Sequence, residues 1–205
     1  MDSNKFYLYG ASGHCKVVID LIKLNKGNID FIVDDDLSKK RFLDYHVNPP
    51  ELVSKISQNL IISIGNNHIR QGIADSIHIN KFTSICHPQS IIDDSVKIEE
   101  GTVIMAGVVI NSSSMIGKHC IINTSSSIDH DCTVNDYVHI APNATLCGNV
   151  VIGKLSHIGA GSVIIQGMRI GANVTVGAGS VIISDIPDNS VVVGNPGKII
   201  KVKQQ

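Results

Sequence analysis

A histidine and an aspartate stand side by side at His130 and Asp131, within the segment IDHDC. A carboxylate beside an imidazole orients the ring and favours its protonated form, which makes the pair a candidate general base. A solvated surface histidine without a chemical role is the competing interpretation. The segment on its own does not decide between the two.

The pair lies inside a six-residue repeat that runs from Ile92 to Pro187. The first residue of all sixteen hexads is Ile, Val or Leu, and the fifth is mostly small or mid-sized and uncharged. Such a period predicts a parallel β-helix, a three-sided prism whose first and fifth residues point inward. Three hexads make a coil of about 18 residues, so the stretch predicts about five coils. Five glycines at second positions are expected to form corners with positive φ; they are Gly117, Gly153, Gly159, Gly171 and Gly177.

Position within the hexad sets the direction of each side chain. His130 is third and Asp131 fourth, so both are expected to point outward. His139 follows nine residues after His130, which is half a coil, so one prism places the two histidines on nearly opposite sides. They meet only if a neighbouring prism contributes its own His139, as a threefold bundle would do. His157 stacks one coil above His139, but residues stacked on one edge do not surround an ion, so no metal site is expected.

The start of the chain has the pattern of a β-loop-α-β unit: a strand over 5–9, a GASGH loop, a helix over 15–26 and a strand over 29–33 that ends in three aspartates. Amides at a helix start can hold an anionic group, and acids after the second strand can bind a ribose or base. The loop is not G-x-G-x-x-G, so a single nucleotide suits it better than a dinucleotide. A plain turn beside a solvated acidic loop is an equally weighted alternative.

Further short elements are expected before the repeat: a helix after Pro50, a strand over 60–64, a helix over 68–79 and a strand over 82–86. The turn at Gly65 follows a strand, where open α/β sheets bind ligands. The sequence therefore predicts a Rossmann-like α/β domain over 1–86, followed by a β-helix domain with a C-terminal tail over 87–205.

Composition narrows the class of protein. With 205 residues, a net charge of −1 and 17% charged residues, the chain lacks the basic character of a nucleic-acid binder. No apolar run reaches the length of a membrane span, and the start has no signal-peptide layout. Five cysteines, an odd number without paired spacing, indicate reduced thiols and a cytoplasmic location. Cys120 and Cys132 fall at inward fifth positions, where small core residues are expected.

In order along the chain, the motifs GASGH, VDDD, IGNN, INTSS, DHDC, VHIAPNA, CGNV, HIGAGSVIIQG and GNPGK resemble those of the hexapeptide-repeat sugar acyltransferases. The chain looks nearest to the bacterial acetyl-CoA-dependent N-acetyltransferases of nucleotide-linked 4-amino-sugars, such as the bacillosamine-pathway enzyme. A sister branch holds the sialic acid O-acetyltransferases. The resemblance covers essentially the whole chain and implies a left-handed β-helix and a homotrimer with acetyl-CoA between adjacent prisms.

The resemblance also implies roles for single residues. His130 matches the catalytic base, Asp131 the acid that raises its basicity, and His139 the histidine that contacts the acetyl thioester. The remaining matches are Ala160 and Gly167 for the pantetheine arm; Ser12, Gly13, His14, Asp34, Asp35 and Gly65 for the nucleotide-sugar; and Asn123 for the sugar. Because three aspartates follow the second strand, the pair that touches the nucleotide is open by one residue.

These observations predict an acetyl-CoA-dependent N-acetyltransferase that acts on the 4-amino group of a UDP-linked amino-deoxy-sugar for bacterial glycan synthesis, without a required metal. A sialic acid O-acetyltransferase is the alternative, because the base chemistry is the same; the GASGH loop with its aspartates favours a UDP-sugar. A non-catalytic hexapeptide scaffold is the alternative of another class. A scaffold has no need of a His-Asp pair with a second histidine half a coil away.

Overall fold

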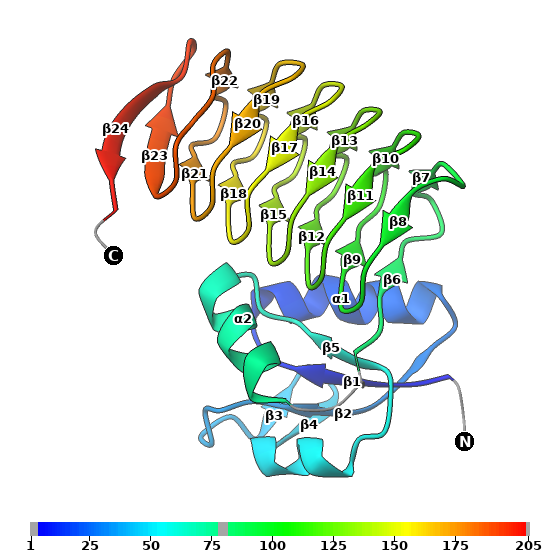
Figure 1. Cartoon of the computed structure of the whole chain (residues 1–205). Helices are drawn as coiled ribbons and strands as arrows, with labels where there is room; N and C mark the ends of the chain where they lie inside the picture. Colours follow the sequence, from blue (N-terminus) through cyan, green and yellow to red (C-terminus); the bar gives the residue numbers. More distant parts are fainter. Residues whose placement is uncertain (1–3, 78–81, 204–205) are drawn as a thin grey trace.

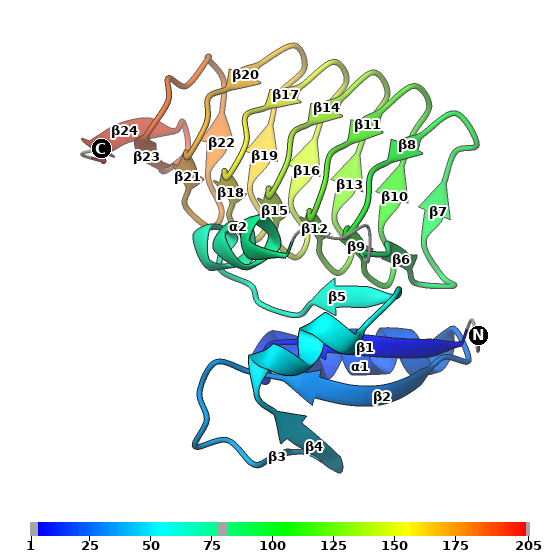
Figure 2. The ribbon, with the colours of Figure 1, turned by 60° about the horizontal axis from the view of Figure 1, so that its bottom comes forward.

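A computed structural model describes residues 4–77 and 82–203. A small α/β domain forms one layer, and a prism of stacked coils lies across it, with the long axis of the prism along the layer (Figure 1). Seen from a second direction, α2 and the strands β6, β9 and β12 lie at the contact between the two parts (Figure 2). No helix in these two stretches is long and apolar enough to cross a membrane.

The α/β domain is built on a five-stranded sheet in the order β3-β4-β2-β1-β5. Its strands are β1 (Lys5–Tyr9), β2 (Asn28–Val33), β3 (Arg41–Phe42), β4 (Tyr45–Asn48) and β5 (Leu60–Ile62). β1 pairs in parallel with β2 and β5, so the loops after these three strands meet at one edge of the sheet. The β3–β4 hairpin was not predicted from the sequence, and β4 extends the sheet in parallel beside β2.

Three helical segments flank this sheet: α1 (Gly13–Leu24), the 3₁₀ helix η1 (Pro50–Lys55) and α2 (Asn67–Ser76). α1 lies between the sheet and the prism, because its buried Val18 and Ile22 share one core with Leu8 of β1 and with Val103 and Ile121 of the prism. The helix expected over 68–79 corresponds to α2, and its last two positions lie outside the described residues.

The prism has three parallel sheets. Sheet 1 faces the α/β domain and contains β6 (Ile85–Cys86), β9 (Val103–Ile104), β12 (Ile121–Ile122), β15 (His139–Ile140), β18 (His157–Ile158), β21 (Thr175–Val176), β23 (Ser190–Val193) and β24 (Lys198–Val202), the last paired antiparallel. Sheet 2 contains β7 (Ile91–Ile92), β10 (Val109–Ile110), β13 (Ser127–Ile128), β16 (Thr145–Leu146), β19 (Val163–Ile164) and β22 (Val181–Ile182). Sheet 3 contains β8 (Lys97–Ile98), β11 (Met115–Ile116), β14 (Thr133–Val134), β17 (Val151–Ile152) and β20 (Arg169–Ile170).

The inward positions of the repeat form the core as predicted. First-position residues such as Ile128 and Ile140 are fully buried, and so are fifth-position residues such as Cys132 and Ala144. Polar fifth-position residues are satisfied locally; for example, the Ser114 hydroxyl donates to the Asp129 carbonyl and accepts from the Cys132 amide. The parallel β-helix is confirmed, and its left-handed sense stays a prediction from the resemblance.

The prediction about the corners was wrong. Positive φ occurs at the fourth position of the hexad, for example at Asp131 (60°) and Gly167 (74°), and not at the second-position glycines. The second position needs glycine for space: a Cβ on Gly159 would lie 2.5 Å from the Val176 carbonyl oxygen of the next coil. Glycine there permits close stacking of coils and does not supply a left-handed turn.

The ends of the prism extend beyond the repeat. The strand expected over 82–86 is the short β6, which pairs with β9 and so begins sheet 1. At the other end, β23 pairs in parallel with β21, and the tail forms β24, which folds back on β23 as an antiparallel hairpin.

Candidate active site

The His130–Asp131 pair lies on the outer edge between sheets 2 and 3. The His130 Nδ1 and Asp131 Oδ2 atoms are 2.7 Å apart, and both side chains are more than half exposed. Asp131 occupies the fourth, left-handed position of its hexad (φ 60°), and its carboxylate closes on the ring of the preceding residue. The carboxylate accepts the Nδ1 proton, so Nε2 is left with its lone pair free for a substrate.

A second carboxylate supports the same histidine. The Asp129 Oδ1 atom accepts from the His130 amide at 2.9 Å and from Asn111 Nδ2 at 2.8 Å. The pKa of His130 is raised, first by the hydrogen bond to Asp131 and then by the charge of Asp129. Sequence reasoning gave Asp129 no role; its signal was an acid on each side of the histidine.

The His130 ring rests on Gly148, which stands one coil further along the same edge. A Cβ on Gly148 would lie 2.7 Å from both Cε1 and Nε2 of the ring. The glycine therefore gives the reactive side of the imidazole its resting surface. Sequence reasoning did not single it out, although 18-residue spacing from His130 would have pointed to it.

His139 lies in contrasting surroundings, on β15 of sheet 1 beneath the α/β domain. Its ring packs edge-on against His157 with centroids 4.9 Å apart, and the His14 ring lies 6.5 Å away. Its Nε2 is 3.1 Å from the Asn123 side-chain amide, and the Gly65 backbone also interacts with the ring. Burial, followed by the charges of its neighbours, lowers the pKa of His139 to about 3.

Three of the predicted nucleotide-sugar contacts lie at the start of α1. Ser12 and Gly13 are exposed, and the Ser12 side chain makes no capping bond. The Cys15 amide donates to the Ser12 carbonyl at 3.0 Å, so the Gly13 and His14 amides are the ones open to a ligand. His14 Nε2 is buried and has no hydrogen-bond partner among the described atoms. This unpaired, buried ring nitrogen faces His139 and its neighbours Asn123 and Gly65, which together are called the His139 cluster below. Such a nitrogen fits a site in which a polar substrate supplies the missing hydrogen bond.

The aspartates after β2 are already engaged by the protein. Asp34 accepts from the Ala11 amide at 2.7 Å, the Asp36 amide at 2.9 Å and Lys39 Nζ at 3.0 Å. Asp35 accepts from the Tyr9 hydroxyl at 2.6 Å. Asp34 thus holds the GASGH loop through the Ala11 amide. Direct contact of Asp34 or Asp35 with a nucleotide stays a prediction.

One chain brings together only part of the predicted set. Asn123, His139, His14 and Gly65 meet where sheet 1 faces the α/β domain. Three other predicted residues lie elsewhere: His130, Asp131 and Gly167 share the edge between sheets 2 and 3, where the Gly167 amide bonds the Gly148 carbonyl. Ala160 follows β18 at the remaining edge of sheet 2. In one chain the predicted site residues therefore lie at separate places, and a site completed by a second prism stays a prediction.

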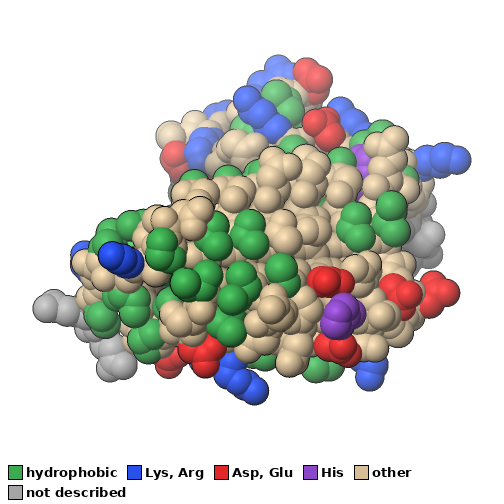
Figure 3. Space-filling view, turned by 90° about the horizontal axis from the view of Figure 1, so that it is seen from above, with side chains coloured by type: hydrophobic (Ala, Val, Ile, Leu, Met, Phe, Trp, Pro, Cys, Tyr) green, Lys and Arg blue, Asp and Glu red, His purple; other side chains and the backbone are tan. Residues whose placement is uncertain are grey.

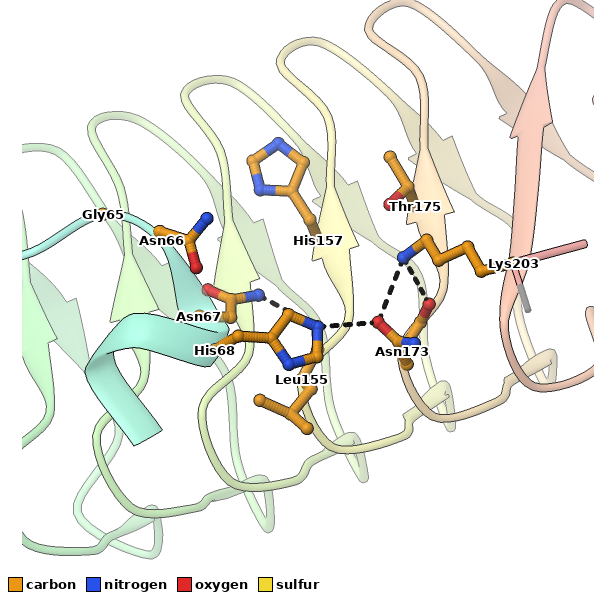
Figure 4. A pocket seen from close by; sticks show the side chains of 9 residues that line it. All are labelled: Gly65, Asn66, Asn67, His68, Leu155, His157, Asn173, Thr175 and Lys203. Carbon is orange, nitrogen blue, oxygen red and sulfur yellow. Dashed lines mark hydrogen bonds between the residues drawn. The ribbon is translucent and has the colours of Figure 1, made fainter. Parts of the chain in front are cut away.

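A cleft continues from the His139 cluster along sheet 1, between the start of α2 and the tail (Figure 4). Its volume is about 270 Å³, and its lining contains no acidic residue. His157 links it to the cluster, and Lys203 bonds the Asn173 carbonyl and side chain at its far end. Side-chain amides, the two histidines His68 and His157, and a lysine make this cleft suitable for an anionic part of a substrate.

The face of the prism that points away from the α/β domain carries mostly uncharged polar and hydrophobic groups, with charges toward its rims (Figure 3). Ile91 and Met115 are large apolar side chains exposed on strands of sheets 2 and 3. Within residues 4–77 and 82–203, no three His, Cys, Asp or Glu side chains are arranged to hold a metal ion.

Comparison with known protein families gives a match in the α/β domain and another in the prism. Residues 5–77 match the PglD N-terminal domain, and residues 131–166 match the six-repeat bacterial transferase hexapeptide. UDP-N-acetylbacillosamine N-acetyltransferase of Bacillus subtilis is 38% identical over 108 residues, 48% of this chain. The match spans about half of that relative's length (50%).

Solved structures match over nearly the whole length. A histidine-to-asparagine mutant of perosamine N-acetyltransferase from Caulobacter crescentus, solved with CoA and GDP-perosamine, is 32% identical over 98% of both chains, with a TM-score of 0.92. The acetyltransferase domain of PglB from Neisseria gonorrhoeae, solved with acetyl coenzyme A, is 35% identical, with a TM-score of 0.88 over 96% of this chain and 99% of that one.

Proposed function

The chain belongs to the hexapeptide-repeat sugar N-acetyltransferases with a PglD-type N-terminal domain, and from this premise we propose that it transfers acetyl from acetyl-CoA to the 4-amino group of a UDP-linked amino-deoxy-sugar. The observation that carries the proposal is the exposed His130, held by Asp131 with its Nε2 free. The names of the relatives support nucleotide-linked amino sugars as the acceptor class.

His130 supplies the proton transfer that the reaction needs. An ammonium group has no lone pair, so the acceptor first gives one proton to solvent. The neutral amine must then lose a second proton as, or just after, its nitrogen bonds the thioester carbonyl carbon. His130 Nε2 takes that proton, and Asp131 stabilises the imidazolium that forms. The C–S bond then breaks and the CoA sulfur leaves as a thiolate, to which the proton passes. Both substrates react directly, so no acyl-enzyme is required.

The side chain of His139 is poorly suited to stabilise the oxyanion. Its Nε2 faces the Asn123 amide, and the Asn123 oxygen is already held by the Thr124 amide at 2.8 Å, which fixes Nδ2 as the donor. His139 Nε2 is therefore an acceptor. We assign the oxyanion donor to a backbone amide at a prism corner, and His139 to the wall of the site against the thioester.

The complete site is shared between chains in this proposal. His130 on the outer edge of one prism faces the His139 cluster on sheet 1 of its neighbour, and a closed ring of three chains repeats the contact. The same contact would bring Gly167 of one chain near Ala160 of the next, along the pantetheine arm. A homotrimer and a cytoplasmic location are part of the proposal.

The identity of the nucleotide on the sugar is a separate part of the proposal. We infer UDP because the Bacillus subtilis relative, at 38% identity, is named for a UDP-sugar. The GDP-perosamine in the Caulobacter crescentus structure makes GDP the competing base. Sialic acid O-acetylation is disfavoured, because the Bacillus subtilis and Caulobacter crescentus relatives are named as N-acetyltransferases, and a non-catalytic scaffold leaves the His130–Asp131 geometry without a purpose.

The test measures thiol release from acetyl-CoA with UDP-linked, GDP-linked and CMP-linked amino sugars and with free sialic acid. We expect turnover with the UDP-linked 4-amino-sugar, and a His130→Ala variant with kcat lowered by roughly 10²–10⁴. His46→Ala, an exposed histidine on β4, is the matched control. Turnover with GDP-sugars alone would correct the nucleotide, and near-normal kcat in His130→Ala would refute the mechanism.

A further inference from the structure

Arg70 on α2 is the largest fully buried side chain in the described part of the molecule, with 1% of its surface exposed. All five of its N–H groups are used. Nε donates to the His119 carbonyl at 2.7 Å, Nη1 to the Ile64 and Gly65 carbonyls at 3.0 and 3.2 Å, and Nη2 to Asn67 Oδ1 and the Tyr137 carbonyl at 2.8 and 3.0 Å. Every acceptor is neutral.

These bonds fasten α2 along one edge of the prism. Arg70 bonds the carbonyls of His119 and Tyr137, and Asn67, one turn earlier, bonds those of Leu155 and Ser156 at 3.0 and 3.1 Å. His119, Tyr137 and Leu155 are 18 residues apart and occupy the same corner of successive coils. The α/β domain is therefore held in one register along the prism axis.

The Gly65 carbonyl connects this latch to the candidate active site. It accepts a hydrogen bond from Arg70 Nη1. The Gly65 backbone also forms a hydrogen bond with the His139 ring that raises the pKa of His139, as an acceptor for a ring N–H does. Because Asn123 Nδ2 faces Nε2, the hydrogen belongs on Nδ1, directed at Gly65. The chain Arg70–Gly65–His139–Asn123 thus joins a buried cation to the predicted sugar contact.

No carboxylate among the described residues lies within ion-pair distance of Arg70. A buried cation without a counter-charge is a costly way to join two domains, since apolar packing would serve for stability alone. The titratable groups that face His139 are His14 from α1, Arg70 from α2 and His157 from β18, and all three disfavour a charge on it.

We propose that Arg70 is a positioning residue for acetyl transfer: through the Gly65 carbonyl it holds His139 in one neutral form, with hydrogen on Nδ1 and with Nε2 turned to Asn123. His139 and Asn123, which form the wall of the site that receives the amino sugar, are thereby fixed relative to the prism. This inference rests on the proposed function for its kinetic consequence, but the state of His139 is measurable without any substrate.

The first experiment is ¹⁵N NMR of histidine-labelled protein, with the His139 signals assigned by their loss in a His139→Gln variant. We expect wild-type His139 to be neutral and protonated on Nδ1 at pH 6. In an Arg70→Met variant, we expect a second tautomer or a titration midpoint moved to higher pH. An Nε2-protonated or charged His139 in the wild type would overturn the proposal, even if Arg70→Met does not fold.

The second experiment compares kinetics per folded enzyme. Displacing the wall by about 1 Å is expected to lower kcat roughly 10- to 100-fold in Arg70→Met. Arg70→Lys keeps the charge but not the five-fold bonding, so it should lose kcat while His139 stays neutral. Ile73→Ala, in the buried core of the same helix, is the matched control for lost stability and should keep kcat. An Arg70→Met enzyme with normal kcat and an unchanged His139 spectrum would reduce Arg70 to a structural latch.

Discussion

His130 and His139 are nine residues apart in the chain and lie in opposite surroundings. His130 is exposed on an outer edge between two carboxylates, which raise its pKa. His139 is partly buried beneath the α/β domain beside two histidines and near Arg70, and its pKa falls to about 3. The surroundings of His130 favour its protonated form, and those of His139 favour its neutral form.

The difference shows how one repeat can supply two kinds of chemistry. Each hexad offers solvent-facing positions, and what packs on them decides their character. At the outer edge the side chain of His130 is more than half exposed, so it can exchange protons with a substrate. On sheet 1 the α/β domain covers His139 and makes it a neutral, fixed group. Pairs of titratable groups with separated pKa values are typical of acid–base sites.

After the loss of His130 itself, the largest expected effect at the outer edge comes from disturbing the surface on which His130 rests. Gly148→Ala would place a Cβ 2.7 Å from the ring, and the ring, as the free end of a side chain, would swing away. We expect kcat to fall roughly 10- to 100-fold, with little change in melting temperature, because Gly148 does not have positive φ.

Steady-state kinetics and thermal melting on the same preparations check this. Gly72→Ala on α2, where a Cβ meets nothing within 4 Å, is the control and should keep wild-type kcat. Normal turnover in Gly148→Ala would mean that the ring position on Gly148 is not the reactive one.

A smaller effect is expected from Asp131→Asn, which removes the charge and keeps the shape. Asparagine tolerates the left-handed φ of 60° at this position, so the fold should persist. The pKa of His130 is raised by Asp131, so the base is neutral only above its ordinary range, and the acidic limb of kcat lies there. In the variant this limb should move to lower pH, while the plateau falls about tenfold because the base is weaker and less well oriented.

The pH dependence of kcat measured from pH 5 to 9 gives both quantities. A limb that stays in place would belong to the acceptor amine, and the assignment of Asp131 as the group that tunes His130 would fail.

A separate effect concerns stability in acid. Burial lowers the pKa of His14 and His119 to about 4 and that of His139 to about 3. Unfolded chains bind these protons below pH 6.5 and the folded chain does not, so stability is full above 6.5 and declines toward pH 4. Each buried histidine should cost on the order of 1–2 kcal/mol between pH 6.5 and 5.

Exposed His130, whose pKa is raised, acts weakly in the opposite direction. Thermal melting in a series of buffers checks the sign of the sum. A melting temperature that stays constant or rises from pH 7 to pH 5 would contradict the buried, neutral state of the His139 cluster.

The prism was predictable because every hexad obeys one local rule. Ile128 and Cys132 could be placed inward from period alone, and both are fully buried. The corners were misread because the rule there is not local: a glycine such as Gly159 is required by the neighbouring coil, and positive φ belongs to the fourth position.

The candidate site was predictable only where its parts are adjacent in sequence. His130 and Asp131 are neighbours, and the structure joins them. Gly148 touches the ring only because coils stack, and Arg70 reaches Gly65 only because α2 docks on the prism. A lone arginine on the same helical face as Ile73 was the one sequence signal for that docking.

The most direct test of the shared site mixes two inactive proteins. His130→Ala chains are combined with chains that carry a severe His139 substitution, and the mixed oligomers are isolated through two affinity tags. If each site takes His130 from one chain and His139 from its neighbour, every mixed ring of three chains has one intact junction among its three, so about a third of the sites in the isolated mixed trimers are restored. Recovery approaching that fraction of wild-type kcat is the predicted result. Mixed oligomers with no recovered activity would contradict a site divided between the exposed edge of one prism and the buried cluster of the next.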